Sequence, residues 1–343
     1  MSTTTRRGER GIALLIVLLT ITLLTIVVVE FTQSAEVETH FAISARNGLQ
    51  ALYLARSAVN VGEAVLAADG MVKGGSQNLW AHPIPPMPVG DGVAGMRIED
   101  EGRRFNLNGL LRDGAIVQTR MAVLQRLFQE IQADPRVLAQ IADWLDTDQN
   151  PWPDPPGAEQ PAYIGLTPPV TVRNAPALTL RELLQVHDMT PKLFARLEQF
   201  VTVLPSNDFK VNINTAPPEV LNALSPTMTR AVVDRVIAAR QQMFFESPDA
   251  GKIDGEASGW REAIGGPESS GGGGDYVATT SDYFRIGAMG QINDVTRGLV
   301  AVVKREGRRI RRVTWAPSTA DLNLTSESPS DFLQSLPSFG GQS

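Results

Sequence analysis

Acidic side chains gather in one short, proline-rich stretch of the chain. The set comprises Asp143, Asp146, Asp148, Asp154 and Glu159. Calcium takes six to eight oxygen ligands, and a loop gives carboxylates and carbonyls the freedom to converge on it. The spacing of these acids is not that of an EF-hand. The pattern therefore predicts a calcium site held by Asp143, Asp146, Asp148 and Glu159. In a competing interpretation, Asp146 and Asp148 cap helices and the remaining charge is solvated.

A second acidic group could supply calcium ligands equally well. It consists of Asp249, Asp254 and Glu256, which lie in a glycine-rich stretch. Paired acids can also hydrolyse glycosides, but such enzymes need a sugar-binding cleft, and aromatic residues are only 6% of the chain. We expect no enzymatic activity and no cofactor other than calcium.

Other chemistries are excluded by composition. The chain has no cysteine, so it has neither disulfides nor thiolate sites. Its three histidines, His40, His82 and His187, lack the spacing of zinc ligands. The net charge of −6 and the absence of a large basic region argue against a nucleic-acid partner.

The amino terminus predicts a membrane anchor. Residues 1–11 carry Arg6, Arg7 and Arg10, and residues 12–29 form an uncharged apolar run about 27 Å long as a helix, close to the thickness of a bilayer core. Because the arginines precede the run, we expect a cytoplasmic N-terminus and a body on the far side of the membrane. A secretory signal peptide fits poorly, since its apolar core is shorter, whereas a plain single-span anchor fits well.

The predicted fold is α+β, with one long helix, an antiparallel sheet and a large helical insertion. Apolar and small residues recur at helical spacing through residues 45–66, and no proline occurs before residue 83, so one helix should run from Ile12 to about Ala68. We expect a pilin-like first part over residues 30–112, in which residues 82–92 connect the helix to a strand at residues 95–100. Further strands are expected at residues 283–290, 294–305 and 308–315 within a C-terminal part spanning residues 277–316.

Residues 113–243 are predicted to form the helical insertion, as two or three small modules of the SAM-like or helix-hairpin-helix kind. The helices are expected at residues 121–132, 135–145, 179–186, 191–204, 217–224 and 229–241. Residues 244–276 read as a glycine-rich loop and residues 317–343 as a disordered tail.

The sequence VNINTAPPEVL, which begins at Val211, resembles the opening of helix-hairpin-helix DNA-binding domains. Those domains use glycines in the hairpin so that backbone amides can approach a phosphate. Here the hairpin reads Ser-Pro-Thr-Met-Thr from Ser225, and Pro226 removes one amide. We therefore expect Asn212 and Asn214 to tie a turn before a packed helix.

The junction RGERG-IALLIVLL resembles the leader of type IV pilins and type II secretion pseudopilins. That resemblance implies cleavage by a prepilin peptidase between Gly11 and Ile12, followed by methylation of the new amino terminus. Most pilins carry a glutamate at the fifth mature position, where this chain has Ile16. The resemblance then implies a tip subunit, because a subunit without that carboxylate cannot pair with the amino terminus of a neighbour.

Four motifs in order resemble the type II secretion system protein K family, the large minor pseudopilins. They are the leader without an acidic fifth residue, RFNLNGL from Arg104, DWLDTD from Asp143 with Gly157 downstream, and VNINTA from Val211. The resemblance implies a single-pass inner-membrane protein whose periplasmic body caps the pseudopilus with the I- and J-type minor pseudopilins and supports export across the outer membrane. A membrane-anchored helix-hairpin-helix DNA-binding protein and a minor pilin of a type IV pilus are the alternatives.

Overall fold

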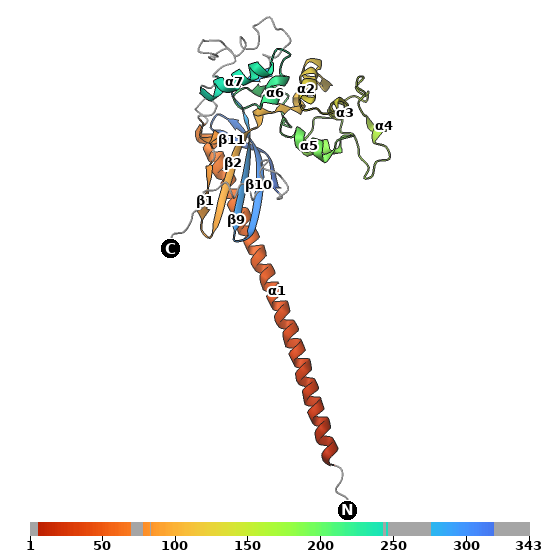
Figure 1. Ribbon diagram of the computed structural model, residues 1–343, viewed down its shortest axis with the longest axis vertical. Coiled ribbons are helices and arrows are strands. Elements are labelled where there is room, and N and C mark those ends of the chain that lie inside the picture. Colours follow the sequence, from red (N-terminus) through yellow and green to blue (C-terminus); the bar gives the residue numbers. More distant parts are fainter. Residues whose placement is uncertain (1–5, 70–77, 83, 243–244, 246–275, 319–343) are drawn as a thin grey trace, which may run out of the picture.

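A single helix dominates the shape of the molecule. The computed structural model describes residues 6–69, 78–82, 84–242, 245 and 276–318. Helix α1 (Arg6–Ala68) projects far below the body in its N-terminal half, and its C-terminal half packs on the sheet (Figure 1). The predicted end at Ala68 is confirmed. Thr20, Thr22 and Thr25 each donate a side-chain hydrogen bond to the backbone carbonyl four residues earlier, so these hydroxyls need no water inside a membrane.

Five antiparallel strands form the sheet, in the order β1-β2-β9-β10-β11. Their bounds are β1 (Ile84–Val89), β2 (Gly92–Asp100), β9 (Tyr283–Ile292), β10 (Val295–Glu306) and β11 (Arg309–Ser318). The expected strands are confirmed: β2, β9 and β11 are longer than predicted, and β10 has the predicted length but is shifted by one residue. The connection expected at residues 82–92 was wrong in part, because it contains β1. Its prolines Pro85, Pro86 and Pro88 lack the N–H of an inner strand, which suits the edge position.

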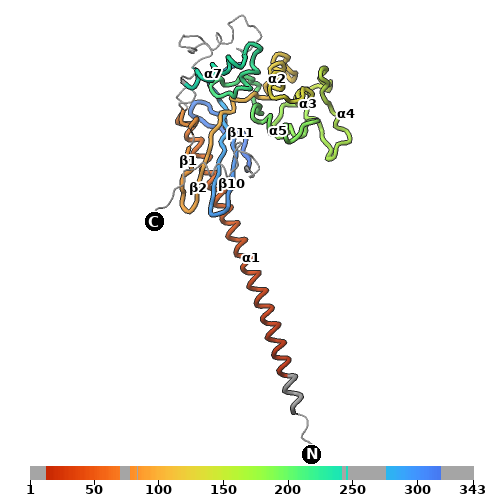
Figure 2. The backbone as a smooth tube through the Cα atoms, in the orientation of Figure 1, coloured from red at the N-terminus to blue at the C-terminus, as the bar shows by residue number. Residues whose placement is uncertain are grey.

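The insertion lies between β2 and β9, at the end of the sheet farthest from the N-terminus (Figure 2). Its helices are α2 (Gln118–Glu130), α3 (Pro135–Leu145), α4 (Gln160–Tyr163), η5 (Leu180–Gln185), α5 (Pro191–Leu197), α6 (Pro218–Ala223) and α7 (Arg230–Gln242). Short pairs of strands brace them: β3 (Phe105–Asn106) with β6 (Val201–Thr202), β4 (Leu111–Arg112) with β5 (Ala115–Ile116), and β7 (Val211–Asn212) with β8 (Val277–Ala278). The 3₁₀ turns η2 (Leu79–Ala81), η3 (Glu101–Arg103) and η4 (Leu107–Leu110) complete the body.

Two helix predictions in the insertion were wrong in detail. The helix expected at residues 191–204 ends at Leu197, because Val201 and Thr202 pair in parallel with Phe105 and Asn106. Local apolar spacing cannot anticipate this pairing, since its partner lies about 100 residues earlier. Residues 180–185 form a 3₁₀ helix, where an α-helix was expected, and a capping box between Thr179 and Glu182 begins it.

The body has two separate hydrophobic cores. One joins α1 to the sheet and includes Val59, Leu66, Ile286 and Leu299. The other lies wholly inside the insertion, around Phe105, Leu124, Ile141, Leu221 and related side chains. No residue belongs to both among those that the structure describes. The sheet and the insertion therefore meet through polar groups, which are described below.

Candidate functional site

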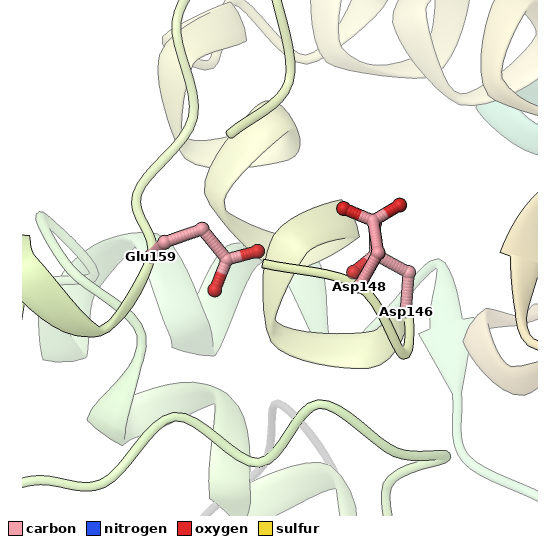
Figure 3. A group of neighbouring side chains, drawn as sticks. All are labelled: Asp146, Asp148 and Glu159. Carbon is pink, nitrogen blue, oxygen red and sulfur yellow. The ribbon is translucent and has the colours of Figure 1, made fainter. Parts of the chain in front are cut away.

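The predicted acidic site forms where α3 ends. Asp143 lies in the last turn of α3, Asp146 is its C-cap, and Asp148 follows in the loop. Glu159 stands just before α4 and returns to the same place, so that ligand atoms of Asp146, Asp148 and Glu159 lie within 4.8 Å of one another (Figure 3). Three of the four predicted ligands thus converge, and Asp143 lies near enough for its charge to raise the pKa of Asp146 and of Glu159.

Burial and mutual repulsion mark this cluster. Asp143, Asp146 and Glu159 are buried, and Asp148 is exposed. Burial, together with the neighbouring charges of Asp148, Asp143 and Glu159, raises the pKa of Asp146 to about 7. Burial likewise raises the pKa of Asp143 to about 6 and is the main cause of a raised pKa at Glu159. These carboxylates are therefore costly in their charged form unless a cation neutralises them.

Oxygen atoms within the cluster lack partners. Among the described residues, Asp146 Oδ1 and Glu159 Oε1 are buried without a hydrogen bond. The side-chain oxygen of Asn174 is in the same condition, while the Asn174 amide donates to the Asp148 carbonyl at 2.7 Å. Asn174 has a left-handed backbone, with φ at 43°. Sequence reasoning missed Asn174, because it lies 15 residues beyond Glu159 in a stretch without other acidic residues.

The helix-capping interpretation fits less well. Asp134, and neither Asp146 nor Asp148, caps the N-terminus of α3 by accepting from the Arg136 amide. Asp146 sits at the C-terminal end of α3, where the helix dipole disfavours negative charge. Asp148 does accept from the Asn150 amide, so it stabilises a local turn. The hard oxygen donors fit a calcium ion.

Asp143 has a supporting place in this arrangement. Its Oδ1 accepts from the Trp152 amide at 2.8 Å, and an added Cβ at Gly157 would lie 1.8 Å from its Oδ2. Gly157 thus lets the loop close over the carboxylate. Asp154 is exposed and outside the cluster. The alternative ligands Asp249, Asp254 and Glu256 lie outside the described residues.

Four asparagines connect loops of the insertion through hydrogen bonds from their side chains to the backbone. Asn106 donates to the Ser206 carbonyl and accepts from the Leu204 amide, and Asn108 exchanges hydrogen bonds with the backbone of Ala177. Asn214 bonds the backbone of Phe245 and the carbonyl of Thr279. The asparagines of RFNLNGL and VNINTA therefore replace secondary structure in loops. The predicted turn-tying role of Asn212 and Asn214 is confirmed, because Asn212 Oδ1 accepts from the Asn214 amide.

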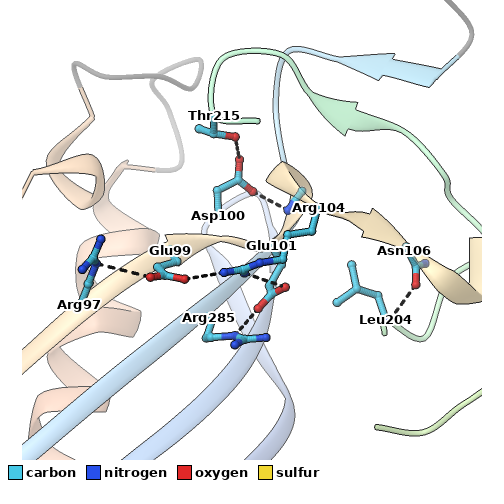
Figure 4. Close-up of polar contacts among 10 residues, drawn as sticks. Arg97, Glu99, Asp100, Glu101, Arg104, Asn106, Leu204, Thr215 and Arg285 are labelled. Carbon is cyan, nitrogen blue, oxygen red and sulfur yellow. Dashed lines mark hydrogen bonds and ion pairs between the residues drawn. The ribbon is translucent and has the colours of Figure 1, made fainter. Parts of the chain in front are cut away.

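Charged residues at the end of β2 form a second polar site, where the sheet meets the insertion. Asp100 and Glu101 are both buried (Figure 4). Burial raises the pKa of Asp100, despite hydrogen bonds from Thr215, Ser281 and Asn212. Glu101 is also desolvated, but the charges of Arg285 and Arg104 outweigh this and hold its pKa below the ordinary value.

The hairpin between α6 and α7 does not present a phosphate cradle. The amide of Thr227 donates to Ser225 Oγ, that of Met228 to the Ser225 carbonyl and that of Thr229 to the Thr227 carbonyl. Pro226 has no amide to offer. The backbone amides that would bind phosphate in a helix-hairpin-helix domain thus donate hydrogen bonds within the turn.

The anchor is one continuous helix through the predicted processing site. Gly11 and Ile12 both lie within α1, and α1 is long and apolar enough to cross a membrane, with a mean hydropathy of 2.8 over its most apolar window. Ile16 is 56% exposed on the bare part of this helix.

Together, an anchor helix packed on an antiparallel sheet and a helical insertion define a pilin-like, membrane-anchored subunit. Family models of type II secretion system protein K match residues 103–206 and 211–260. Type II secretion system protein K of Aeromonas hydrophila is 30% identical over 320 residues, covering 87% of this chain and 94% of the relative. That of Pseudomonas aeruginosa is 31% identical over 262 residues, covering 71% and 76%.

The fold is also similar to a chain of the solved GspK-GspI-GspJ complex of the type II secretion system from enterotoxigenic Escherichia coli. The TM-score is 0.65 at 18% identity, and the match covers 81% of this chain and 99% of that one. The chain belongs to the type II secretion system protein K family. The predicted family, the α+β fold and the role of a minor pseudopilin in protein secretion are thereby confirmed.

Proposed function

We propose that this subunit forms the tip of the periplasmic pseudopilus together with two other minor pseudopilins, of the I and J types. The observation that carries the proposal is the bare stretch of α1 between the membrane span and the sheet. Residues 30–46 are exposed around the helix, including Phe31, Val37 and Phe41. Apolar side chains exposed outside a bilayer mark a protein interface. The solved GspK-GspI-GspJ complex supports two other subunits as the occupants.

The tip position has a second basis in Ile16. A carboxylate in lipid is costly unless a cation meets it. In pilins that cation is the amino terminus of a neighbouring subunit. In this chain the corresponding amino terminus would be that of Ile12, after cleavage from Gly11. With Ile16 in place, no subunit is held beyond this one. We place the leader in the cytoplasm and the body in the periplasm, and propose a structural role with no catalytic step.

Copurification of the full chain in detergent with the two other minor pseudopilins tests this proposal. Phe41→Glu should abolish or strongly reduce the complex, because it places a charge on the bare helix. Ile164→Glu is the matched control, since Phe41 and Ile164 are both 76% exposed and Ile164 lies in the insertion. The proposal fails if the parent chain recovers neither subunit, or if both variants recover them equally.

We further propose that the acidic cluster binds calcium as a structural ion. Asp146, Asp148 and Glu159 would hold it with the side-chain oxygen of Asn174, and Asp143 would support them. Bound calcium would neutralise the carboxylates and fix the loop of residues 146–174 to the end of α3. Titration calorimetry with calcium tests the site, and magnesium serves as the comparison. An absence of heat together with an unchanged melting temperature would leave the acids as solvated charge.

A further inference from the structure

The sheet and the insertion are joined by a narrow polar connection. The chain leaves the sheet at Asp100, where β2 ends, and returns at Ser281, just before β9. These two crossings are neighbours, because Asp100 pairs with Phe284 across the β2–β9 ladder. Two adjacent strands form a ribbon, about which the insertion could swing. Inter-domain contacts without a large apolar interface permit such motion by default, and here the two cores share no described residue.

A third contact between the sheet and the insertion lies away from this two-stranded ribbon and restrains the swing of the insertion. Thr215 Oγ1 donates to Asp100 Oδ2 at 2.5 Å, and Asn212 Nδ2 donates to the same oxygen at 2.8 Å (Figure 4 shows the first). Both donors lie more than 110 residues from Asp100: Asn212 ends β7, and Thr215 lies in the loop between β7 and α6. Asn212 Nδ2 also donates to Ser281 Oγ at 3.2 Å, so the loop is tied to both crossings at once.

Asp100 is closely surrounded by its neighbours. The Gly102 amide donates to Asp100 Oδ1 at 2.7 Å, so both carboxylate oxygens are engaged. A Cβ on Gly102 would lie 2.2 Å from Ser281 Oγ, and only glycine allows the two crossings to approach this closely. Hydrogen bonds to a buried acceptor are directional, and a buried donor left unpaired is costly.

We propose that Asp100 is a positioning residue: by holding Asn212 and Thr215, it locks the insertion in one orientation on the anchored sheet. The VNINTA motif, which resembles the start of a DNA-binding hairpin, supplies the two side chains that Asp100 holds. The two lobes each keep their own core when the lock is opened, but their relative orientation becomes variable.

Distance measurement by pulsed electron spin resonance tests the lock in the full chain in detergent. Because the chain has no cysteine, labels can be placed at Lys192→Cys on α5 and Arg311→Cys on β11, both exposed, without background labelling. Asp100→Asn keeps the shape of the side chain but replaces one carboxylate oxygen by an NH2 group, so that a donor faces donors where an acceptor stood. The distance distribution should broaden by roughly two-fold or more, as polar inter-domain contacts permit motion, while far-UV circular dichroism stays unchanged.

Controls separate the lock from general destabilisation. Asp113→Asn, in the exposed turn between β4 and β5, makes the same chemical change away from the junction and should leave the distribution narrow. Thr215→Val removes one hydrogen bond and should broaden the distance distribution. Thr215→Ser keeps the hydroxyl and should leave the distribution as narrow as in the parent. These milder variants decide the matter if Asp100→Asn does not fold. A distribution as narrow in Thr215→Val and Asp100→Asn as in the parent, whatever their melting temperatures, overturns the proposal. The readout needs no other subunit, so it does not depend on the tip proposal.

Discussion

Gly290 of β9 lies against the backbone of Ala51 in α1 so closely that a Cβ on Gly290 would be 2.1 Å from the Ala51 carbonyl oxygen. The anchor helix and the sheet are therefore in backbone contact at this point. Farther along the same interface, Gly62 of α1 faces only side chains, with Ile286 Cγ2 at 3.0 Å from its added Cβ as the nearest atom. Two glycines of one interface thus differ in what opposes them.

Gly290→Ala should lower the free energy of unfolding by about 1–3 kcal/mol or more, because backbone atoms cannot yield without moving α1 off the sheet. Gly62→Ala should be nearly neutral, since the flexible Ile286 side chain can shift and alanine favours a helix over glycine by about 1 kcal/mol. Urea unfolding of the full chain in detergent measures both. Equal losses in the two variants would contradict the assigned contact.

The acidic cluster predicts a pH dependence of the calcium-free protein. The pKa of Asp143 is raised to about 6 and that of Asp146 to about 7, mainly by burial, whereas both should titrate near 3.8 when unfolded. Between these values the folded state binds more protons than the unfolded state. The stability contributed by the two groups is thus greatest at low pH and is lost as pH rises from about 4 to about 7.

Melting curves in a chelator from pH 5 to pH 8 should show this decline, and saturating calcium should remove it. Asp146→Asn should flatten the decline in the chelator, because one titrating group is gone. A melting temperature that rises with pH through this range in the parent, and equally in the variant, would contradict the assigned pKa directions.

Removing one charge from the acidic cluster should also distinguish the effect of charge repulsion on stability from the effect of bound calcium. Asp146→Asn should raise the melting temperature in the chelator, because a buried carboxylate among three other acidic side chains is replaced by a neutral group. It should also reduce the stabilisation by calcium, which at a hundredfold excess over Kd amounts to about 2.7 kcal/mol for one site. Asn174→Gly is a second test, since glycine keeps the left-handed backbone and removes the side-chain oxygen together with the NH2 group that donates to the Asp148 carbonyl.

For Asn174→Gly we expect weaker calcium binding in calorimetry and, in the chelator, a loss of about 1 kcal/mol of stability, because the hydrogen bond to the Asp148 carbonyl is gone. Asp113→Asn, outside the cluster, should change neither quantity. If Asn174→Gly binds calcium like the parent, the Asn174 oxygen is not a ligand.

Local pattern in the sequence was sufficient for some elements and not for others. The long helix, the strands near the C-terminus and α3 follow from periodicity and proline placement, and Asp146, Asp148 and Glu159 converge because a short loop joins them. The Asn174 contribution and the β3–β6 pair depend on residues brought together by the tertiary fold, and no local spacing encodes them. Asp100 was also missed, because its donors come from a loop more than 110 residues away.

Ile16 offers a test of the tip position. Ile16→Glu supplies the carboxylate that pilins use to pair with the amino terminus of a neighbour, at a cost of about 3 kcal/mol for an unpaired acid in the bilayer. If a further subunit can then be held, the variant should form crosslinks through its first turn to the amino terminus of another pseudopilin, where the parent does not. Ile16→Gln is the control, because it is polar and similar in size but carries no charge. Equal crosslinking of the glutamate and glutamine variants would show that charge at this position does not decide whether a neighbour is accepted.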